Sequence, residues 1–151
     1  MANNIYDIAK QGFLTGVNID GTETQINWGG ATQSDDFRVA LVGAGYTPDL
    51  VNHINMEAVA PVIATAPLVV SSQDSNGTAY AEPVTFTGLP DDGTVVEALV
   101  VYRENNEGET PVDSENILIT YIEDAENLPL ILNGGDVTIE WDLGQDKVFK
   151  L

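Results

Sequence analysis

After residue 56 the chain repeats one local pattern, in which short apolar runs alternate with turns rich in glycine, proline and aspartate. The runs include VTF at residues 84–86 and TVVEALVVYRE at residues 94–104, and PDDG separates them at residues 90–93. In such turns proline presets one backbone dihedral and glycine accepts a positive φ. Short strands at this spacing are typical of antiparallel all-β domains. We therefore predict an all-β fold, a single antiparallel β-sandwich for which a jelly-roll topology is one option.

The first 16 residues are predicted to form an N-terminal arm. Ile5, Ile8 and Phe13 lie near helical spacing, and one of the asparagines before them can cap a short helix. Because chain ends are mobile unless they dock, the apolar stripe on this arm either packs on its own domain or contacts a partner. We take residues 1–16 as the arm and residues 17–151 as one β-sandwich domain. The candidate interface residues on the arm are Ile5, Ile8, Phe13 and Leu14.

A second short helix is predicted over residues 47–56. Thr47 suits the N-cap position and Pro48 the first helical position, with Asp49 directly behind them. His53, the only histidine of the chain, lies four residues after Asp49, which favours a capping or packing role. With one histidine, neither a His–His metal pair nor a Ser–His–Asp triad with a spare base can be drawn.

Charge is the strongest compositional signal. The chain has 24 acidic and 5 basic residues, a formal net charge of −19. A surface of this sign repels nucleic acid, so we expect no nucleic-acid partner. The same net charge opposes aggregation of the protein at high local concentration. The sequence has no cysteine, which removes disulfides and thiolate chemistry. It shows neither a secretory signal nor an apolar run of about 18 residues, so we expect no membrane partner.

Two aspartate pairs are the remaining candidates for chemistry. Asp35–Asp36 and Asp91–Asp92 resemble the paired carboxylates of glycosidases and calcium sites. Both pairs lie in predicted turns, where aspartate is common because its side chain bonds to the local backbone. We therefore predict a protein that is not an enzyme, with no catalytic residue, no cofactor and no metal ligand. A carbohydrate- or calcium-binding β-sandwich module is kept as an alternative.

The C-terminal segment, residues 133–151, is predicted to end in a buried hairpin. Its last residues include Phe149 and Leu151, and an exposed apolar edge strand invites aggregation. We therefore predict that residues 146–151 pair with residues 136–142 across the turn LGQD.

Three stretches that together cover nearly the whole chain carry a resemblance to a known group of proteins. The first runs from GFLTG through INWGG to FRVALVGAGYTPDLVNHINM at residues 37–56. The others are VTFTGLPDDGTVVEALVVYRE at residues 84–104 and ITYIEDAENLPLILNGGDVTIEWDLGQDKVFKL at residues 119–151. In this order they resemble small virion structural proteins of tailed bacteriophages. The most specific parts are EALVVYRE and the ending NGGDVTIEWDLGQDKVFKL. The chain departs from the group in DGTETQ, inserted before Ile26, and in the long loop NNEGETPVDSE.

The resemblance implies a capsid decoration or cement protein that binds the shell of the major capsid protein. It implies a homo-oligomer, such as a trimer, made in the host cytoplasm and placed on the capsid surface of the virion. It implies no catalytic residues. A tail or head-fibre structural protein is the alternative within the same group.

Overall fold

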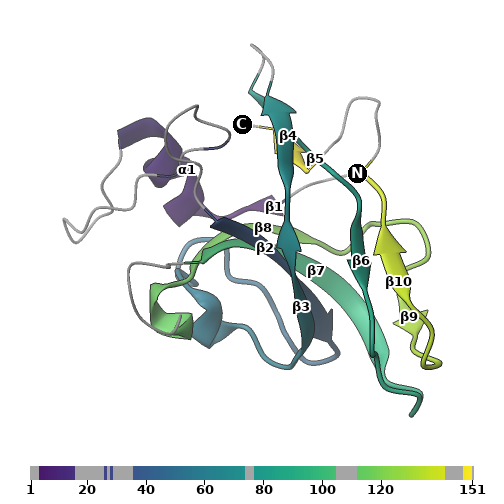
Figure 1. Ribbon diagram of the computed structural model, residues 1–151. Coiled ribbons are helices and arrows are strands. Elements are labelled where there is room, and N and C mark those ends of the chain that lie inside the picture. Colours follow the sequence, from purple (N-terminus) through teal and green to yellow (C-terminus); the bar gives the residue numbers. More distant parts are fainter. Residues whose placement is uncertain are drawn as a thin grey trace.

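A six-stranded antiparallel sheet forms the centre of the fold in the computed structural model (Figure 1). The strand order is β1-β8-β7-β2-β3, and β9 pairs with β7 outside this path. The strands are β1 (Asn4–Ile5), β2 (Asp36–Gly43), β3 (Val62–Leu68), β7 (Val95–Glu104), β8 (Ile117–Ile122) and β9 (Leu130–Ile131). The structure describes residues 4–15, 26, 28, 36–73, 77–104, 112–141 and 148–150.

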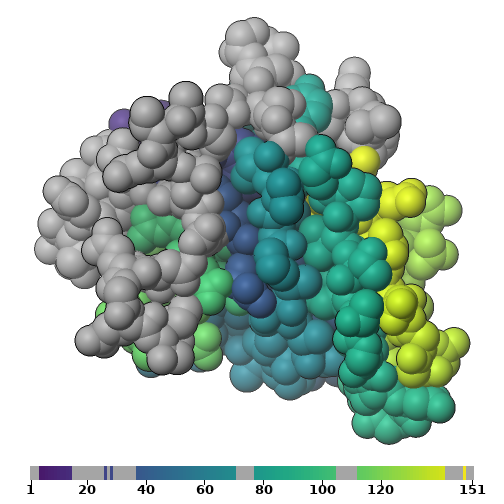
Figure 2. All heavy atoms as spheres, in the orientation of Figure 1, coloured from purple at the N-terminus to yellow at the C-terminus, as the bar shows by residue number. Residues whose placement is uncertain are grey.

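The other strands form two smaller antiparallel sheets. One is a three-stranded sheet of order β11-β5-β4 and the other is a two-stranded ribbon, β10-β6. In Figure 2 the ribbon and β3 lie side by side on one face of the molecule. The prediction of an antiparallel all-β fold is confirmed, while the β-sandwich stays a prediction. The bounds are β4 (Val70–Gln73), β5 (Thr78–Ala81), β6 (Val84–Phe86), β10 (Val137–Ile139) and β11 (Phe149–Lys150).

The predicted C-terminal hairpin is wrong. β10 pairs with β6, with Ile139 opposite Val84, and β11 pairs with β5, with Phe149 opposite Ala79. Both strands therefore run back along the same earlier stretch, β5 followed by β6, instead of along each other. Between Ile139 and Phe149 the chain advances ten residues, whereas their partners are five apart. Val148, just before β11, is nevertheless fully buried, and its N–H donates to the Ala79 carbonyl over 3.0 Å. The predicted burial of Phe149 and Leu151 concerns side chains outside those that the structure describes.

The N-terminal helix is confirmed as α1 (Asp7–Thr15), but the predicted asparagine cap is wrong. Asn4 lies in β1, which pairs with β8 and holds the segment on the large sheet. The Tyr6 N–H then donates to the Ile119 carbonyl over 3.0 Å, and the helix begins at the next residue. Among the described residues, no helix has the length and apolar character needed to cross a membrane.

The predicted helix over residues 47–56 is replaced by a single turn. The His53 N–H donates to the Asp49 carbonyl over 2.9 Å. The Asp49 side chain accepts from the N–H groups of Val51 and Asn52. A short 3₁₀ helix, η1 (Met56–Ala58), follows, capped by the Asn55 side chain, which accepts from the Glu57 N–H over 3.2 Å. Asp49 thus makes the bonds of an N-cap residue two positions after Thr47, and Asn55 caps the next helical turn, so two short turns stand in place of one helix. A second 3₁₀ helix, η2 (Asp113–Glu115), precedes β8.

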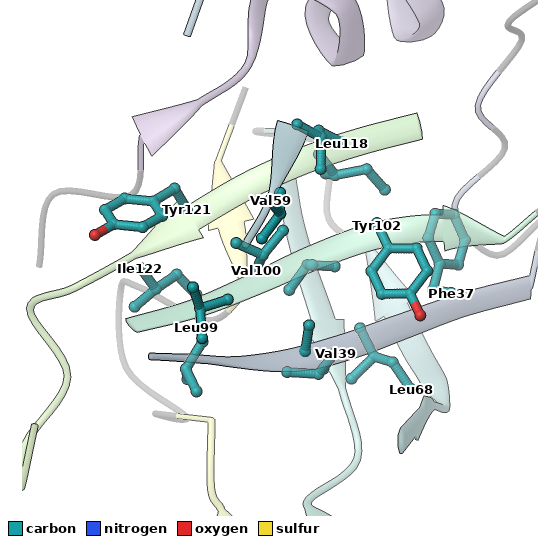
Figure 3. Packing of buried hydrophobic residues seen from close by; sticks show 14 of the residues in the cluster. Phe37, Val39, Val59, Leu68, Leu99, Val100, Tyr102, Leu118, Tyr121 and Ile122 are labelled. Atoms are coloured by element: carbon teal, nitrogen blue, oxygen red, sulfur yellow. The ribbon is translucent and has the colours of Figure 1, made fainter. Parts of the chain in front are cut away.

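The middle strands of the large sheet are buried on both faces. All six residues of β8 are buried, and so are residues 98–102 of β7. Figure 3 shows Leu99 and Ile122 next to one another, as their pairing across β7 and β8 requires. Strict alternation along β7 would place the side chains of Val96 and Ala98 on the same face of the sheet. The register between β7 and β2 shifts, however, between Val42 and Gly43. The resulting irregularity places Val96 on the same side as Leu99 instead.

Candidate functional site

An open groove of about 1090 Å³ lies between the large sheet and the β6–β10 ribbon. Its floor is made by Leu41 of β2 and by Val96 and Leu99 of β7. Leu41 and Leu99 are direct cross-strand partners, and all three side chains are buried. The shift in the β7 register is therefore what gives the groove a continuous apolar floor.

One wall of the groove is β10 with its flanking residues. All six residues from 136 to 141 line the groove, so the strand runs along it. Val137, Ile139 and Trp141 are half-buried there, and the Trp141 indole Nε1–H donates to the Glu82 carbonyl over 2.9 Å. The Thr85 and Thr138 hydroxyls, on the two strands of the ribbon, lie 3.0 Å apart. This wall thus carries half-buried apolar side chains at alternate positions, and the exposed residues between them lie at its opening.

The rim of the groove is acidic. Glu82, Glu126, Asp136 and Glu140 are all exposed and line the opening, whereas no lysine or arginine is among the lining residues that the structure describes. The opposite wall is formed by the first residue of β9 and by the segment before it. The lining residues of that wall are Ala125, Glu126, Asn127, Leu128 and Leu130. The groove combines an apolar interior with a rim that attracts positive charge.

A chain of hydrogen bonds, Tyr6–Tyr46–His53, is the second polar cluster. The Tyr6 and Tyr46 hydroxyls are 2.7 Å apart, and the Tyr46 hydroxyl is 3.1 Å from His53 Nδ1. The Asp49 N–H also donates to His53 Nδ1 over 3.1 Å, so this nitrogen is an acceptor and carries no proton. Tyr46 therefore donates to His53, and Tyr6 donates to Tyr46. His53 has the capping and packing role that the sequence predicts, with its ring stacked on Tyr46 at 5.6 Å.

Burial keeps these tyrosines neutral. It raises the pKa of Tyr6 far above its ordinary value, and the hydrogen bond to Tyr46 adds to the effect. Burial also raises the pKa of Tyr46, and it raises the pKa of Tyr121, with help from Glu123, to about 12. A phenol with a raised pKa stays protonated at neutral pH and supplies no phenolate base. The hydrogen bonds of the cluster join the N-terminal segment to the loop at residues 46–53.

The candidate carboxylate pairs serve their own turns or lie outside the described residues. The Asp92 side chain accepts from the backbone and hydroxyl of Thr94, and these bonds lower its pKa. Asp91 packs beside Gly134 of the facing turn. Asp35 lies outside the described residues, and the side chain of Asp36 is not described either. Within the described part of the chain, no three acidic or histidine side chains gather as metal ligands do.

The four candidate interface residues of the arm have different environments. Ile5 and Ile8 are buried in the core of their own domain, and Phe13 packs partly against it. Leu14 is 82 % exposed, so it is the one of the four that a partner can reach without rearrangement. Figure 1 shows α1 at one side of the molecule and the β6–β10 ribbon at the other. The arm and the groove are therefore separate surfaces.

Comparison of the chain with protein-family models, with curated protein sequences and with solved structures returned no match. The groove is thus described from its own geometry. The sequence did not predict the groove because its floor, with Val96 and Leu99, belongs to the large sheet, whereas Trp141 follows β10 of the ribbon. Only the alternation around Trp141 gave a local signal.

Proposed function

We propose that the chain is a non-enzymatic virion structural protein of a tailed bacteriophage that decorates the capsid. The observation that carries the proposal is the apolar groove with its acidic rim, set on a sheet whose central strands are buried on both faces. A rigid scaffold with an uncovered apolar recess is suited to docking on another protein. The resemblance of residues 37–56, 84–104 and 119–151 to phage virion proteins supports the major capsid protein as that partner.

The proposal includes self-association on the capsid surface, in a homo-oligomer such as a trimer. Two exposed apolar side chains outside the groove, Leu14 and Val51, suit contacts between subunits. They belong to neighbouring elements, because the Asp7 N–H at the start of α1 donates to the Leu50 carbonyl over 2.8 Å. The net charge of −19 keeps free subunits apart in solution, so we expect assembly on the shell.

Co-sedimentation tests the proposal. Shells of the phage that encodes the protein, prepared without it, are mixed with increasing amounts of purified protein and then pelleted. We expect binding that saturates at a fixed ratio to the major capsid protein, and we expect the protein at that ratio in purified virions. Protein that stays in the supernatant at all concentrations, together with its absence from virions, would refute the proposal.

A carbohydrate-binding module is a second candidate, favoured by Trp141. Its half-buried indole is held in the groove by the bond to Glu82, and indole rings are good stacking surfaces. A rise in melting temperature with soluble sugars, without binding to shells, would support this candidate over capsid decoration.

A further inference from the structure

We propose that the groove binds an extended, positively charged peptide segment of a partner protein, which adds as a strand to the edge of β10. The inference rests on the proposed function only in treating the groove as a docking site. It does not require the partner to be a capsid protein.

The backbone of β10 supplies the first argument. Within the described part of the chain, β10 pairs with β6 and with no other strand. In an antiparallel pair, alternate residues point their N–H and C=O groups away from the partner strand. Since residues 136–141 line the groove without interruption, the outward groups of this strand lie along it. An added strand would satisfy them, as in other peptide sites built on a sheet edge.

The side chains define the apolar half of the partner segment. Val137, Ile139 and Trp141 occupy alternate positions of the wall, and the floor below them is formed by Leu99 and Leu41. Successive side chains of an extended segment point to opposite sides. We therefore expect apolar residues at every second position of the segment, in contact with this wall and floor.

The rim defines the charge of the segment. Glu82, Glu126, Asp136 and Glu140 are exposed at the opening, and no basic side chain among the described lining residues neutralises them. Two of the described cations are engaged elsewhere, because Lys10 bonds to Asp7 at 2.8 Å and Arg38 to Glu104 at 3.3 Å. A second copy of this chain, with a net charge of −19, would be repelled. A lysine-rich segment of another protein is complementary.

A labelled probe peptide, acetyl-Lys-Val-Lys-Leu-Lys-Val-Lys-amide, tests the inference by fluorescence anisotropy at low salt. Three peptides are compared: this probe, the same peptide with glutamate in place of lysine, and the probe with alternate backbone nitrogens methylated. We expect the probe to bind, the glutamate peptide not to bind, and the methylated probe to bind at least about tenfold more weakly, because it cannot pair with β10. No binding of the probe, or equal binding of probe and glutamate peptide, would overturn the inference. Equal binding of methylated and unmethylated probes would overturn strand addition.

A matched pair of variants separates the groove from the general charge. Asp136→Lys/Glu140→Lys reverses two exposed rim charges, and Glu57→Lys/Asp113→Lys reverses two exposed charges near the 3₁₀ helices. Both change the net charge equally. We expect the rim variant to weaken probe binding about tenfold and the control to weaken it less than about twofold. Equal losses in both would overturn the inference, even if the protein co-sediments with shells. Probe binding without co-sedimentation would instead refute capsid decoration alone.

Discussion

Substituting Tyr6 by phenylalanine removes the first donor of the Tyr6–Tyr46–His53 chain without changing the packing of the ring. Tyr6 is wholly buried, and its hydroxyl is 2.7 Å from that of Tyr46. Because Tyr46 donates to His53, its oxygen depends on Tyr6 for a hydrogen-bond donor. A hydrogen bond contributes about 0.5–1.5 kcal/mol net, and a partner left unsatisfied adds to the cost. We expect the free energy of unfolding to fall by about 1–2 kcal/mol, and the melting temperature by about 4 °C.

A double-mutant cycle with Tyr46→Phe isolates this bond. Urea unfolding of the wild type, the two single variants and the double variant gives four free energies of unfolding. If the two hydroxyls interact as the structure shows, the double variant loses less than the sum of the single losses, by about 1 kcal/mol. Additive losses would mean that the two groups do not interact in solution, and the assignment of donors would be wrong.

The same variant changes the response to alkaline pH. The pKa of Tyr6 is raised in the folded protein, so its contribution to stability is fully present below the unfolded value of about 10 and is lost as pH rises above it. Tyr6→Phe has no hydroxyl to ionise at this position. Between pH 8 and pH 11 the wild type should therefore lose more stability than the variant, measured as the shift in urea midpoint by circular dichroism. Parallel losses in the two proteins would contradict the reasoning.

Three further changes test other parts of the fold. Val148→Ala should lower the free energy of unfolding by about 2 kcal/mol, because this side chain is fully buried near the C-terminus; an unchanged urea midpoint would mean that the last strand is peripheral. Gly134→Ala should cost more than Gly93→Ala in a thermal melt: their φ angles of 79° and 77° are nearly equal, but only at Gly134 would a new Cβ lie 3.0 Å from an aspartate side chain of the facing turn. Hydrogen bonds, first of all from the Asn52 side chain, lower the pKa of Asp49, so its contribution is present above pH 4 and is lost as pH falls through the folded value. Asp49→Asn should accordingly lose less stability than the wild type between pH 7 and pH 3 in urea unfolding; an equal loss would show that this carboxylate is not linked to folding.

Local patterns were sufficient for the elements whose residues dictate their own conformation. The strands at Val84–Phe86 and Val95–Glu104 follow from apolar and β-branched runs between turn residues, and the sequence predicts both. The N-terminal helix was also predicted from its apolar spacing. The predicted helix at residues 47–56 is wrong, because Asp49 caps a single turn and Asn55 then caps a separate 3₁₀ helix.

Strand partners were not predictable in the same way, because alternation is identical whichever strand lies opposite. The alternation at Val137 and Ile139 predicts a half-buried strand. The nearest apolar run along the chain is at residues 146–151, so the sequence suggested a hairpin between these two segments. The structure pairs them with Phe86 and Val84, which are more than 50 residues earlier. The choice depends on which pairing buries more apolar surface over the large sheet, a property of the whole fold.

The groove follows from that choice of partner. β9 and β10 are consecutive, but β9 pairs with Val95 and Val96 in the large sheet, whereas β10 joins β6 in the ribbon. The turn between them is fixed by the Leu132 N–H, which donates to the Thr94 carbonyl over 2.8 Å, and by a bond from Gly134 to the turn before β7. From this point the two strands separate into different sheets, and the space between them is lined by Leu130 on one side and the whole of β10 on the other. Had β10 paired with the C-terminal strand, as the local pattern suggested, its second edge would be occupied. Within the described residues β10 takes a distant partner on one side only, and this leaves the edge that we propose as the docking site.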